Sequence, residues 1–449
     1  MTRISPLSWV LLLAAGTLWA ASQATTAPGP APAVQTLEET NDRHWYKGNL
    51  HTHSYWSDGN DFLEMIALWY RDRGYHFLSF TDHNTLATSE RWVDIDKVKG
   101  GADAYRKLKE RLPDWIEERE RDGKHEVRLR RFTEVSDKFG QPGKYLLVQG
   151  EEISDKFHTH PIHLNAANIQ EQLPPLGGES VYDVMQNNVN AVIAQRERTG
   201  VPIFVHLNHP NFGYAITAED LMRVRGENFF EVYNGHPTVY NKGDEQHAST
   251  DRIWDIVLTL RLTELKLPIM YGLAVDDGHD YHKIPSRASN PGRGWVQVLS
   301  SELSPGALIT ALEAGQFYAS SGVRLKAIHH RADGLEVEVQ PDEAESGMPA
   351  PEYTIEFLGT RKGTSTAGEP VVDKDGKPVH TTKRYDKGIG EVFQTTKGRS
   401  ARYRFGGDEL YVRARVTSSL KHPNPSEVDD PQRAWVQPIL GPGAPSTPQ

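Results

Sequence analysis

The chain contains no cysteine, and this absence excludes two kinds of protein. Without thiols there is no disulfide framework, and no lipobox cysteine is present to carry a lipoprotein anchor. The chain must therefore stay folded through its core and through any metal that it binds. Its 449 residues, 37% hydrophobic and 24% charged, are enough for a large core and predict one large domain plus a smaller one.

The chain also lacks an excess of basic residues. Its formal net charge is -10, whereas proteins that bind nucleic acid need a concentrated basic face. We therefore expect no nucleic acid as a stable partner. Lys and Arg can still gather around a phosphate group, so the net charge leaves the charge of a small substrate open.

A long hydrophobic run is missing as well. The apolar run near the N-terminus, residues 9–15, is shorter than the ~20 residues that a membrane-spanning helix needs. Arg3 precedes this run and a small-x-small triplet follows it at 22–24, an order typical of a secretory signal peptide. The sequence predicts cleavage near Ala24, a periplasmic or secreted protein, and no transmembrane segment after cleavage.

Short apolar runs alternate with amphipathic stretches over residues 44–322. After the opening fragment around "NLHTH", the runs lie at 75–83, 144–152, 161–169, 201–209, 228–236 and 267–279. They are too apolar to have one face in water, so we expect buried parallel strands. Helical periodicity occupies 61–73, 103–121, 180–198 and 250–265. About seven strands alternating with helices predict an α/β fold, a distorted seven-stranded TIM-like (β/α)7 barrel.

Four segments depart from this alternation. Residues 86–144 are long and charged, and we expect an insertion, a helix and then a strand, whose charges are solvated. Beyond about residue 323, apolar and polar residues alternate, which predicts a small all-β, sandwich-like domain over 323–440. The Pro- and Ala-rich linker at 25–43 and the tail at 441–449 are expected to be disordered.

Metal-binding side chains follow nearly every predicted strand. The carboxyl ends of barrel strands share one mouth, where active sites lie. The side chains at these ends are His51, His53, Asp58, Asp82, His83, Glu151, Glu152, His158, His160, His163, His206, His209, Asn234, His236, Asp276, Asp277 and His279. So many imidazoles and carboxylates at one end cost desolvation energy unless they are paired or metal-bound. Such ligands without thiolate suit Zn, Mn or Fe, and their number indicates more than one ion.

Local patterns bear on two of these residues in particular. In "HTH" the strand period of two turns His51 and His53 to the same side. Asp61 followed by Glu64 resembles a capping box, which leaves Asp58 without a capping role. A turn beside the neighbouring glycine remains an alternative role for Asp58.

The motifs "HTHSYWSDG", "TDHN", "GEEIS", "HLNHP" and "DDGH" occur in this order over residues 44–285. Together they resemble the polymerase and histidinol phosphatase (PHP) family of metal-dependent phosphoesterases. The resemblance implies a distorted seven-stranded α/β barrel that holds two to three divalent ions, and the β-rich C-terminus resembles exported PHP proteins with an appended β-domain. The insertion at 86–144 departs from the minimal family pattern.

The resemblance also implies a set of ligands. By position, the metal ligands would be His51, His53, Asp58, His83, Glu152, His163, His209, Asp277 and His279. His51, His53 and Asp277 would bind one ion, Asp58 and His83 a second, and Glu152 would bridge them. His163 and His209 are expected on a third ion. The residues expected to be catalytic are Asp58, Glu152, His209 and Asp277.

Four of these assignments have a close competitor. Glu151 competes with Glu152, His160 with His163, His206 with His209, and Asp276 with Asp277. Because strand side chains alternate, only one of each adjacent acidic pair can face the mouth directly.

The implied reaction is hydrolysis of a phosphate monoester or diester, from a small molecule or the cell envelope, by a metal-bridging hydroxide. The candidate substrate contacts are Asn84, Asn234, His236, His282 and Arg287. For Asn234 and His236 a tight Asn-Gly turn is an equally good interpretation. Asp82 either orients a ligand or the loop, or it is simply a cap.

Two other functions compete with this interpretation. Amidohydrolase-like barrels also use H-x-H on the first strand, but their bridging lysine on the fourth strand has no counterpart in "HPIHLNAANI". A metal-stabilised binding protein for a glycan or a protein partner is the other alternative. Structural metal sites are usually closed and four-coordinate, so this many ligands at an open mouth favour catalysis.

Overall fold

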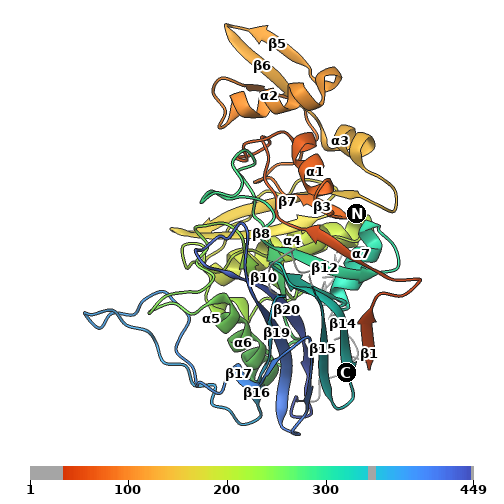
Figure 1. The fold of residues 1–449 in the computed structure, drawn as a ribbon. Coiled ribbons are helices and arrows are strands. Elements are labelled where there is room, and N and C mark those ends of the chain that lie inside the picture. The colour runs from red at the N-terminus through yellow and green to blue at the C-terminus, as the bar shows by residue number, and fades with distance from the viewer. Residues whose placement is uncertain (1–33, 342–349, 446–449) are drawn as a thin grey trace, which may run out of the picture.

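The computed structural model describes residues 34–341 and 350–445. The predicted signal peptide lies outside the described residues. The fold is mixed α/β with a large continuous sheet, as Figure 1 shows. Among the residues described, no helix combines the length and apolar character needed to cross a membrane.

The predicted apolar runs form neighbouring strands of the large sheet. In sheet order these strands are β2 (His44–Asn49), β3 (Phe77–Phe80), β7 (Leu146–Phe157), β8 (His160–Ala167), β9 (Phe204–Leu207), β10 (Phe229–Asn234) and β11 (Tyr271–Val275). β2, β3 and β7 are parallel, and so are β9, β10 and β11. The prediction that all these strands are parallel is wrong for β8, which runs antiparallel to β7 and β9.

A closed seven-stranded barrel is not shown among the described residues. The seven strands belong to a 13-stranded sheet. In this sheet β2 pairs with β3 on one side and with β12 (Trp295–Ser300) on the other. Through β12 the hydrogen-bonded ladder continues into the C-terminal region. The ends of β2 and β11 approach each other at an isolated bridge between Thr52 and Gly278.

Helices cover this part of the sheet. They are α1 (Leu63–Arg71), α4 (Val181–Thr199), α5 (Ala218–Leu221), α6 (Thr250–Leu260), the π-helix η2 (Arg261–Leu265) and α7 (Pro305–Glu313). Ser180 and Ser249 cap α4 and α6 by accepting backbone N–H groups. The predicted capping box of Asp61 and Glu64 is wrong, because α1 begins at Leu63 and Asp61 forms an ion pair with Lys107 instead.

The prediction of a helix and then a strand for residues 86–144 is wrong, because the segment holds three strands and two helices, and its apolar side chains share one core with α1. The segment contains β4 (Arg91–Asp94), α2 (Gly101–Arg111), the 3-10 turn η1 (Pro113–Trp115), β5 (Glu118–Arg121), β6 (Lys124–Leu129) and α3 (Phe132–Phe139). Figure 1 shows β5, β6 and α2 at the top of the molecule, beyond α1 and away from the large sheet. The helix predicted to run to 121 ends at Arg111, since Pro113 follows and disfavours the helical conformation before it.

The C-terminal region is all-β, but it is not a separate sheet system. Its strands are β13 (Phe317–Ser320), β14 (Arg324–Arg331), β15 (Gly334–Gln340), β16 (Tyr353–Arg361), β17 (Glu391–Lys397), β18 (Ser400–Arg404), β19 (Glu409–Lys421) and β20 (Pro431–Leu440). β13, β20, β19, β16 and β17 extend the large sheet, and β14, β15 and β18 form a second sheet with β1 (Gln35–Glu38). The two sheets share a buried apolar core.

Two segments predicted to be disordered are partly ordered. β1 lies inside the predicted linker, where it pairs antiparallel with β14. In the predicted tail, the N–H groups of Gly441 and Gly443 donate to the carbonyls of Leu410 and Glu409. The paired strand supplies backbone partners that composition alone does not reveal.

Candidate metal centre

The ends of β2 and β11 bring the first and last motifs together. The N–H of Asp277 donates to the carbonyl of His51, and the N–H of His53 donates to the carbonyl of Gly278, both at 3.1 Å. The rings of His51 and His53 are fully buried, with centroids 5.1 Å apart. Their Nε2 atoms face Oδ1 of Asp277 at 3.3 and 3.2 Å.

Glu152, on β7, is the carboxylate that most of the histidines face. Its Oε1 lies 3.3 Å from Nε2 of His51, 3.1 Å from Nδ1 of His163 and 3.4 Å from Nε2 of His209. Its Oε2 lies 3.4 Å from Nε2 of His53 and 2.7 Å from Nδ1 of His83. Glu152 therefore lies at the middle of the cluster.

The direction of β8 explains how His163 reaches this cluster. His163 lies in the first half of β8, opposite Ser154. In a parallel strand this position would lie away from the carboxyl ends of the neighbouring strands. Because β8 is antiparallel, its N-terminal half lies at the same edge as those ends.

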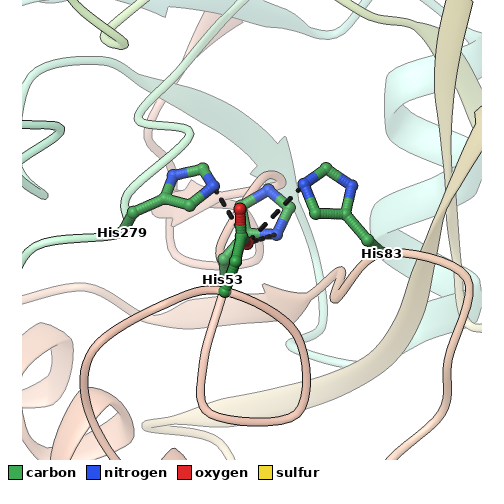
Figure 2. A group of neighbouring side chains, drawn as sticks. His53, His83 and His279 are labelled. Carbon is green, nitrogen blue, oxygen red and sulfur yellow. Dashed lines mark ion pairs between the residues drawn. The ribbon is translucent and has the colours of Figure 1, made fainter. Parts of the chain in front are cut away.

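Asp58 forms the outer side of the cluster. Its Oδ1 lies 3.3 Å from Nε2 of His279, 3.6 Å from Nε2 of His83 and 3.8 Å from Nδ1 of His53. Figure 2 shows His83 and His279 on opposite sides of His53, with the rings turned toward one another. The Asp58 side chain is 59% exposed, whereas His53 is fully buried. This part of the cluster is therefore the one open to solvent.

The donor atoms of these residues fit divalent ions. Ligand atoms lie within 4.8 Å of one another in four overlapping groups: His53, Asp58, His83 and His279; His51, His209 and Asp277; His51, His53 and Glu152; and His83, Glu152 and His163. Nε2 of His51, Nε2 of His53 and Oε2 of Glu152 are buried and have no hydrogen-bond partner within the described residues. Buried polar atoms are costly when unpartnered, and a nitrogen and oxygen donor set suits Zn, Mn or Fe.

The protonation states of Glu152 and His53 agree with ligand roles, whereas neighbouring carboxylates raise the pKa of His51, His83 and His279 against the effect of burial. Burial alone would raise the pKa of Glu152, but the imidazoles of His83, His51 and His163 hold that pKa well below its ordinary value. Burial, together with His279 and His83, lowers the pKa of His53 to about 3. Carboxylates are thus ionised and His53 is neutral, which are the forms that bind metal.

The structure separates the acidic competitors. Glu152 and Asp277 face the cluster, whereas Oε2 of Glu151 accepts the N–H of Leu173 at 2.9 Å. Asp276 accepts the hydroxyl of Tyr70 at 2.8 Å and backbone N–H groups of the loop before β12. Both competitors therefore bind protein groups on the far side of their strands, as alternation requires.

The histidine competitors are separated in the same way. His163 and His209 face Glu152. The ring of His160 is tilted against that of His380, with centroids 4.1 Å apart. His206 is fully buried, with Nε2 3.2 Å from Glu231. Neither His160 nor His206 belongs to a group of described residues that could hold an ion.

Two predicted substrate contacts form hydrogen bonds within the fold. Asn84 accepts the N–H of Ser154 and donates to the Ser154 carbonyl, both at 2.9 Å, so it joins the segment after β3 to β7. The ring of His282 lies 2.7 Å from the carbonyl of Asn60. These contacts give both side chains a structural role, and contact with substrate stays a prediction for Asn84 and His282.

The other three predicted substrate contacts lie in different surroundings. Asn234 is fully buried and donates to Glu231 at 2.8 Å and to Asp277 at 3.1 Å. His236 lies at the rim, with its ring 5.3 Å from that of His279, and burial lowers its pKa to about 4. Arg287 is exposed, and no contact joins it to the cluster among the residues that the structure describes.

Asp82 holds the loop that carries Asp58. Its carboxylate accepts the N–H of Ser54 at 2.8 Å, the Ser54 hydroxyl at 2.7 Å and the Ser57 hydroxyl at 2.6 Å. Of the roles predicted for Asp82, the structure agrees with the one that orients the loop.

Sequence reasoning missed Glu231 and Asn208. Glu231 is fully buried on β10, and neighbouring histidines hold its pKa at about 2 against the effect of burial. Asn208 donates to Oε1 of Glu152 at 2.7 Å. The signal for Glu231 was a charged residue inside the apolar run "FFEVYN", because a buried charge needs partners.

Comparisons with known proteins give structural neighbours only. No protein-family model and no curated protein matches the chain. One similar solved structure is a two-domain protein from Bacteroides vulgatus ATCC 8482 that contains a predicted PHP-like metal-dependent phosphoesterase. It is 14% identical, with 90% of this chain and 98% of that chain covered and a TM-score of 0.38.

Two further neighbours are more distant. A proposed metal-dependent phosphoesterase from Bifidobacterium adolescentis ATCC 15703 is 12% identical, with 53% of this chain and 89% of that chain covered and a TM-score of 0.27. PsfC from Pseudomonas syringae PB-5123 is 14% identical, with 57% and 82% covered and a TM-score of 0.27. The names of the first two agree with the resemblance seen in the sequence. The scores are too low to carry more, so the function must be argued from this chain's residues.

Proposed function

We propose that the chain is a metal-dependent phosphoesterase. The observation that carries the proposal is the convergence of six imidazoles and three carboxylates from separate strand ends, with buried donor atoms that have no hydrogen-bond partner. His53, Asp58, His83 and His279 would hold one ion, and His51, His209 and Asp277 another. Glu152 lies between these groups, and His163 with Glu152 and His83 could hold a third ion.

Bound divalent ions would supply Lewis-acid polarisation of the phosphoryl group and would lower the pKa of a water nucleophile. Side chains of the chain itself would accept and donate protons beside the bound ions. Asp58 is the exposed carboxylate of the centre, so it is placed to accept a proton from water at the mouth. Backbone and hydroxyl groups of Thr238 lie at Nδ1 of His236, which leaves the proton of the neutral ring on Nε2 as a donor for a substrate oxygen.

A phosphate ester fits this centre better than an amide. Amidohydrolase-like sites commonly use a bridging lysine on the fourth strand, and β8 contains no lysine. Clusters of two or more ions suit in-line displacement at phosphorus, because they stabilise both the attacking and the leaving oxygen. The substrate class proposed is therefore a phosphate monoester or diester.

Hydrolysis of matched chromogenic monoester and diester substrates tests the function. The purified chain should release the chromophore after loading with Zn, Mn or Fe, and a metal-stripped sample should not. His53→Ala should lose at least about 100-fold in kcat/KM, whereas His160→Ala, a matched control outside the metal groups, should keep its activity. A folded, metal-loaded protein that hydrolyses neither ester would contradict the proposal.

We also propose that the chain is exported, with cleavage near Ala24. Support comes from the charged start, the short apolar run and the small-x-small triplet of the N-terminal sequence. N-terminal sequencing of the protein made by cells should give a start at or near residue 25. A start at Met1 in the fully processed protein would rule out export through this signal peptide.

A further inference from the structure

Glu231 uses its whole carboxylate on hydrogen bonds. Oε1 lies 2.7 Å from Nδ1 of His51 and 3.2 Å from Nε2 of His206. Oε2 accepts the backbone N–H of His209 and the side-chain amide of Asn234, both at 2.8 Å. A carboxylate offers about four lone pairs, so Glu231 has none left to bind an ion.

These contacts reach every residue of one metal group. His51 is held through its ring and His209 through its backbone. Asp277 is held through Asn234, whose amide donates to Oε2 of Glu231 and, at 3.1 Å, to Oδ2 of Asp277. His51, His209 and Asp277 are the group whose ligand atoms lie within 4.8 Å of one another.

The metal group of His53, Asp58, His83 and His279 is held by other residues. Ser57 lies at Nδ1 of His53, Ser154 lies at Nδ1 of His83, and the Asp277 carbonyl lies at Nδ1 of His279. Asp82 holds the loop of Asp58. Glu231 has no contact with His53, Asp58, His83 or His279 among the residues described, so its effect on the two groups should differ.

The contact with His51 also fixes which nitrogen is free. Because Nδ1 lies 2.7 Å from a carboxylate oxygen, it carries the ring hydrogen and donates it. Nε2 then keeps a lone pair, and it points toward Glu152 and Asp277 at 3.3 Å. A carboxylate behind a histidine commonly orients the ring and makes its free nitrogen a better ligand.

We propose that Glu231 is a positioning residue that builds one ion site, that of His51, His209 and Asp277, without binding the ion itself. This inference rests on the proposed metal centre, but not on the identity of the reaction. Gln at this position would turn two of the four acceptor directions into N–H donors. In either amide orientation, His51 or the pair of His209 and Asn234 would lose its acceptor.

Ion counting on the metal-stripped chain tests the proposal. Wild type, Glu231→Gln and the control Glu227→Gln are titrated with Mn²⁺ or Zn²⁺, desalted and analysed for bound metal. Glu227 is also buried near β10, and its carboxylate accepts only the N–H of Phe229 within the described residues. Glu231→Gln should bind one ion fewer per chain, or bind that ion about 10–100-fold more weakly. Glu227→Gln should match wild type.

Co²⁺ spectra separate positioning from general loss of structure. Glu231→Gln should lose the absorption of one Co²⁺ site and keep the rest, with unchanged far-ultraviolet circular dichroism. Wild-type ion number and affinity in Glu231→Gln would overturn the proposal, and so would loss of every ion from a folded variant. If Glu231→Gln does not fold, Asn234→Ala should weaken the same ion, and unchanged binding would overturn the proposal.

The ion count does not depend on catalysis. A wild-type chain that binds its ions but hydrolyses no phosphate ester would contradict the proposed function and leave the role of Glu231 standing. Equal ion counts and equal affinities in wild type and Glu231→Gln, with active wild type, would contradict the role of Glu231 and leave the proposed function standing.

Discussion

At the scale of single residues, the centre depends on which member of each neighbouring pair faces inward. Strand alternation predicts that only one of Glu151 and Glu152 can do so, but it does not say which. The choice depends on what covers the other face: Glu151 meets the N–H of Leu173. That partner lies 22 residues away in sequence, so a local pattern could not identify it.

Glu231 could have been found from the sequence, whereas Asn208 could not. A glutamate in the middle of an apolar run is costly unless it has partners, and that signal was visible in "FFEVYN". An asparagine beside a histidine motif has no such cost. Its contact with Glu152 depends on how β9 and β7 are placed around β8.

Asp82 should affect activity through the loop that it holds. Asp82→Ala removes the acceptor for Ser54 and Ser57, so Asp58 loses its fixed position. We expect kcat/KM to fall about 10–100-fold, with Asp82→Asn keeping most activity because it retains one oxygen. Steady-state hydrolysis of the preferred chromogenic ester measures both variants. Activity of Asp82→Ala within about twofold of wild type would show that the loop needs no such support.

At the scale of elements, periodicity predicted the seven neighbouring strands and the helices α1, α2, α4 and α6, but it did not predict the direction of each strand. The run at 161–169 has the composition of a buried strand in either direction. β8 is antiparallel because it follows β7 through a tight turn at 158–159, which leaves no room for a crossover. The prediction placed His163 at the mouth, although the direction it assumed for β8 was wrong.

The segment before β10 should make stability depend on pH. Burial raises the pKa of Glu227 from an ordinary 4.5 to about 8, so the folded chain binds more protons than the unfolded chain between these values. Stability therefore falls as pH rises from about 4.5 to about 8. Glu227→Gln removes this cost and should raise the free energy of unfolding at pH 9 by about 1–3 kcal/mol, with little effect at pH 4. Urea denaturation at both pH values measures the difference.

The same denaturation series contains its own control. Wild type and Glu227→Gln should differ more at pH 9 than at pH 4. Equal differences at the two pH values would mean that folding does not shift the pKa of Glu227.

At the scale of the whole molecule, sequence composition could not show how the two regions are joined. Alternation correctly indicated an all-β C-terminal region, but β12 fills the edge of β2 and makes one sheet run through both regions. Which strand fills an exposed edge depends on contacts far apart in sequence.

Removal of metal should destabilise the folded chain. The centre gathers the carboxylates of Asp58, Glu152, Asp277 and Glu231, which repel one another when no cation is present. An ion held at 100 times its dissociation constant stabilises the native state by about 2.7 kcal/mol. Chelation should therefore lower the Tm by several degrees in differential scanning calorimetry. A Tm that is unchanged by chelation, in a sample shown to hold metal, would contradict this expectation.

Anomalous diffraction from crystals of the metal-loaded chain tests the central claim most directly. Data collected on both sides of the absorption edge of the bound metal would locate each ion without any assumption about the reaction. We predict separate anomalous peaks between His53, Asp58, His83 and His279 and between His51, His209 and Asp277, with Glu152 between them. Crystals of metal-loaded protein with no peak among these residues would contradict the account.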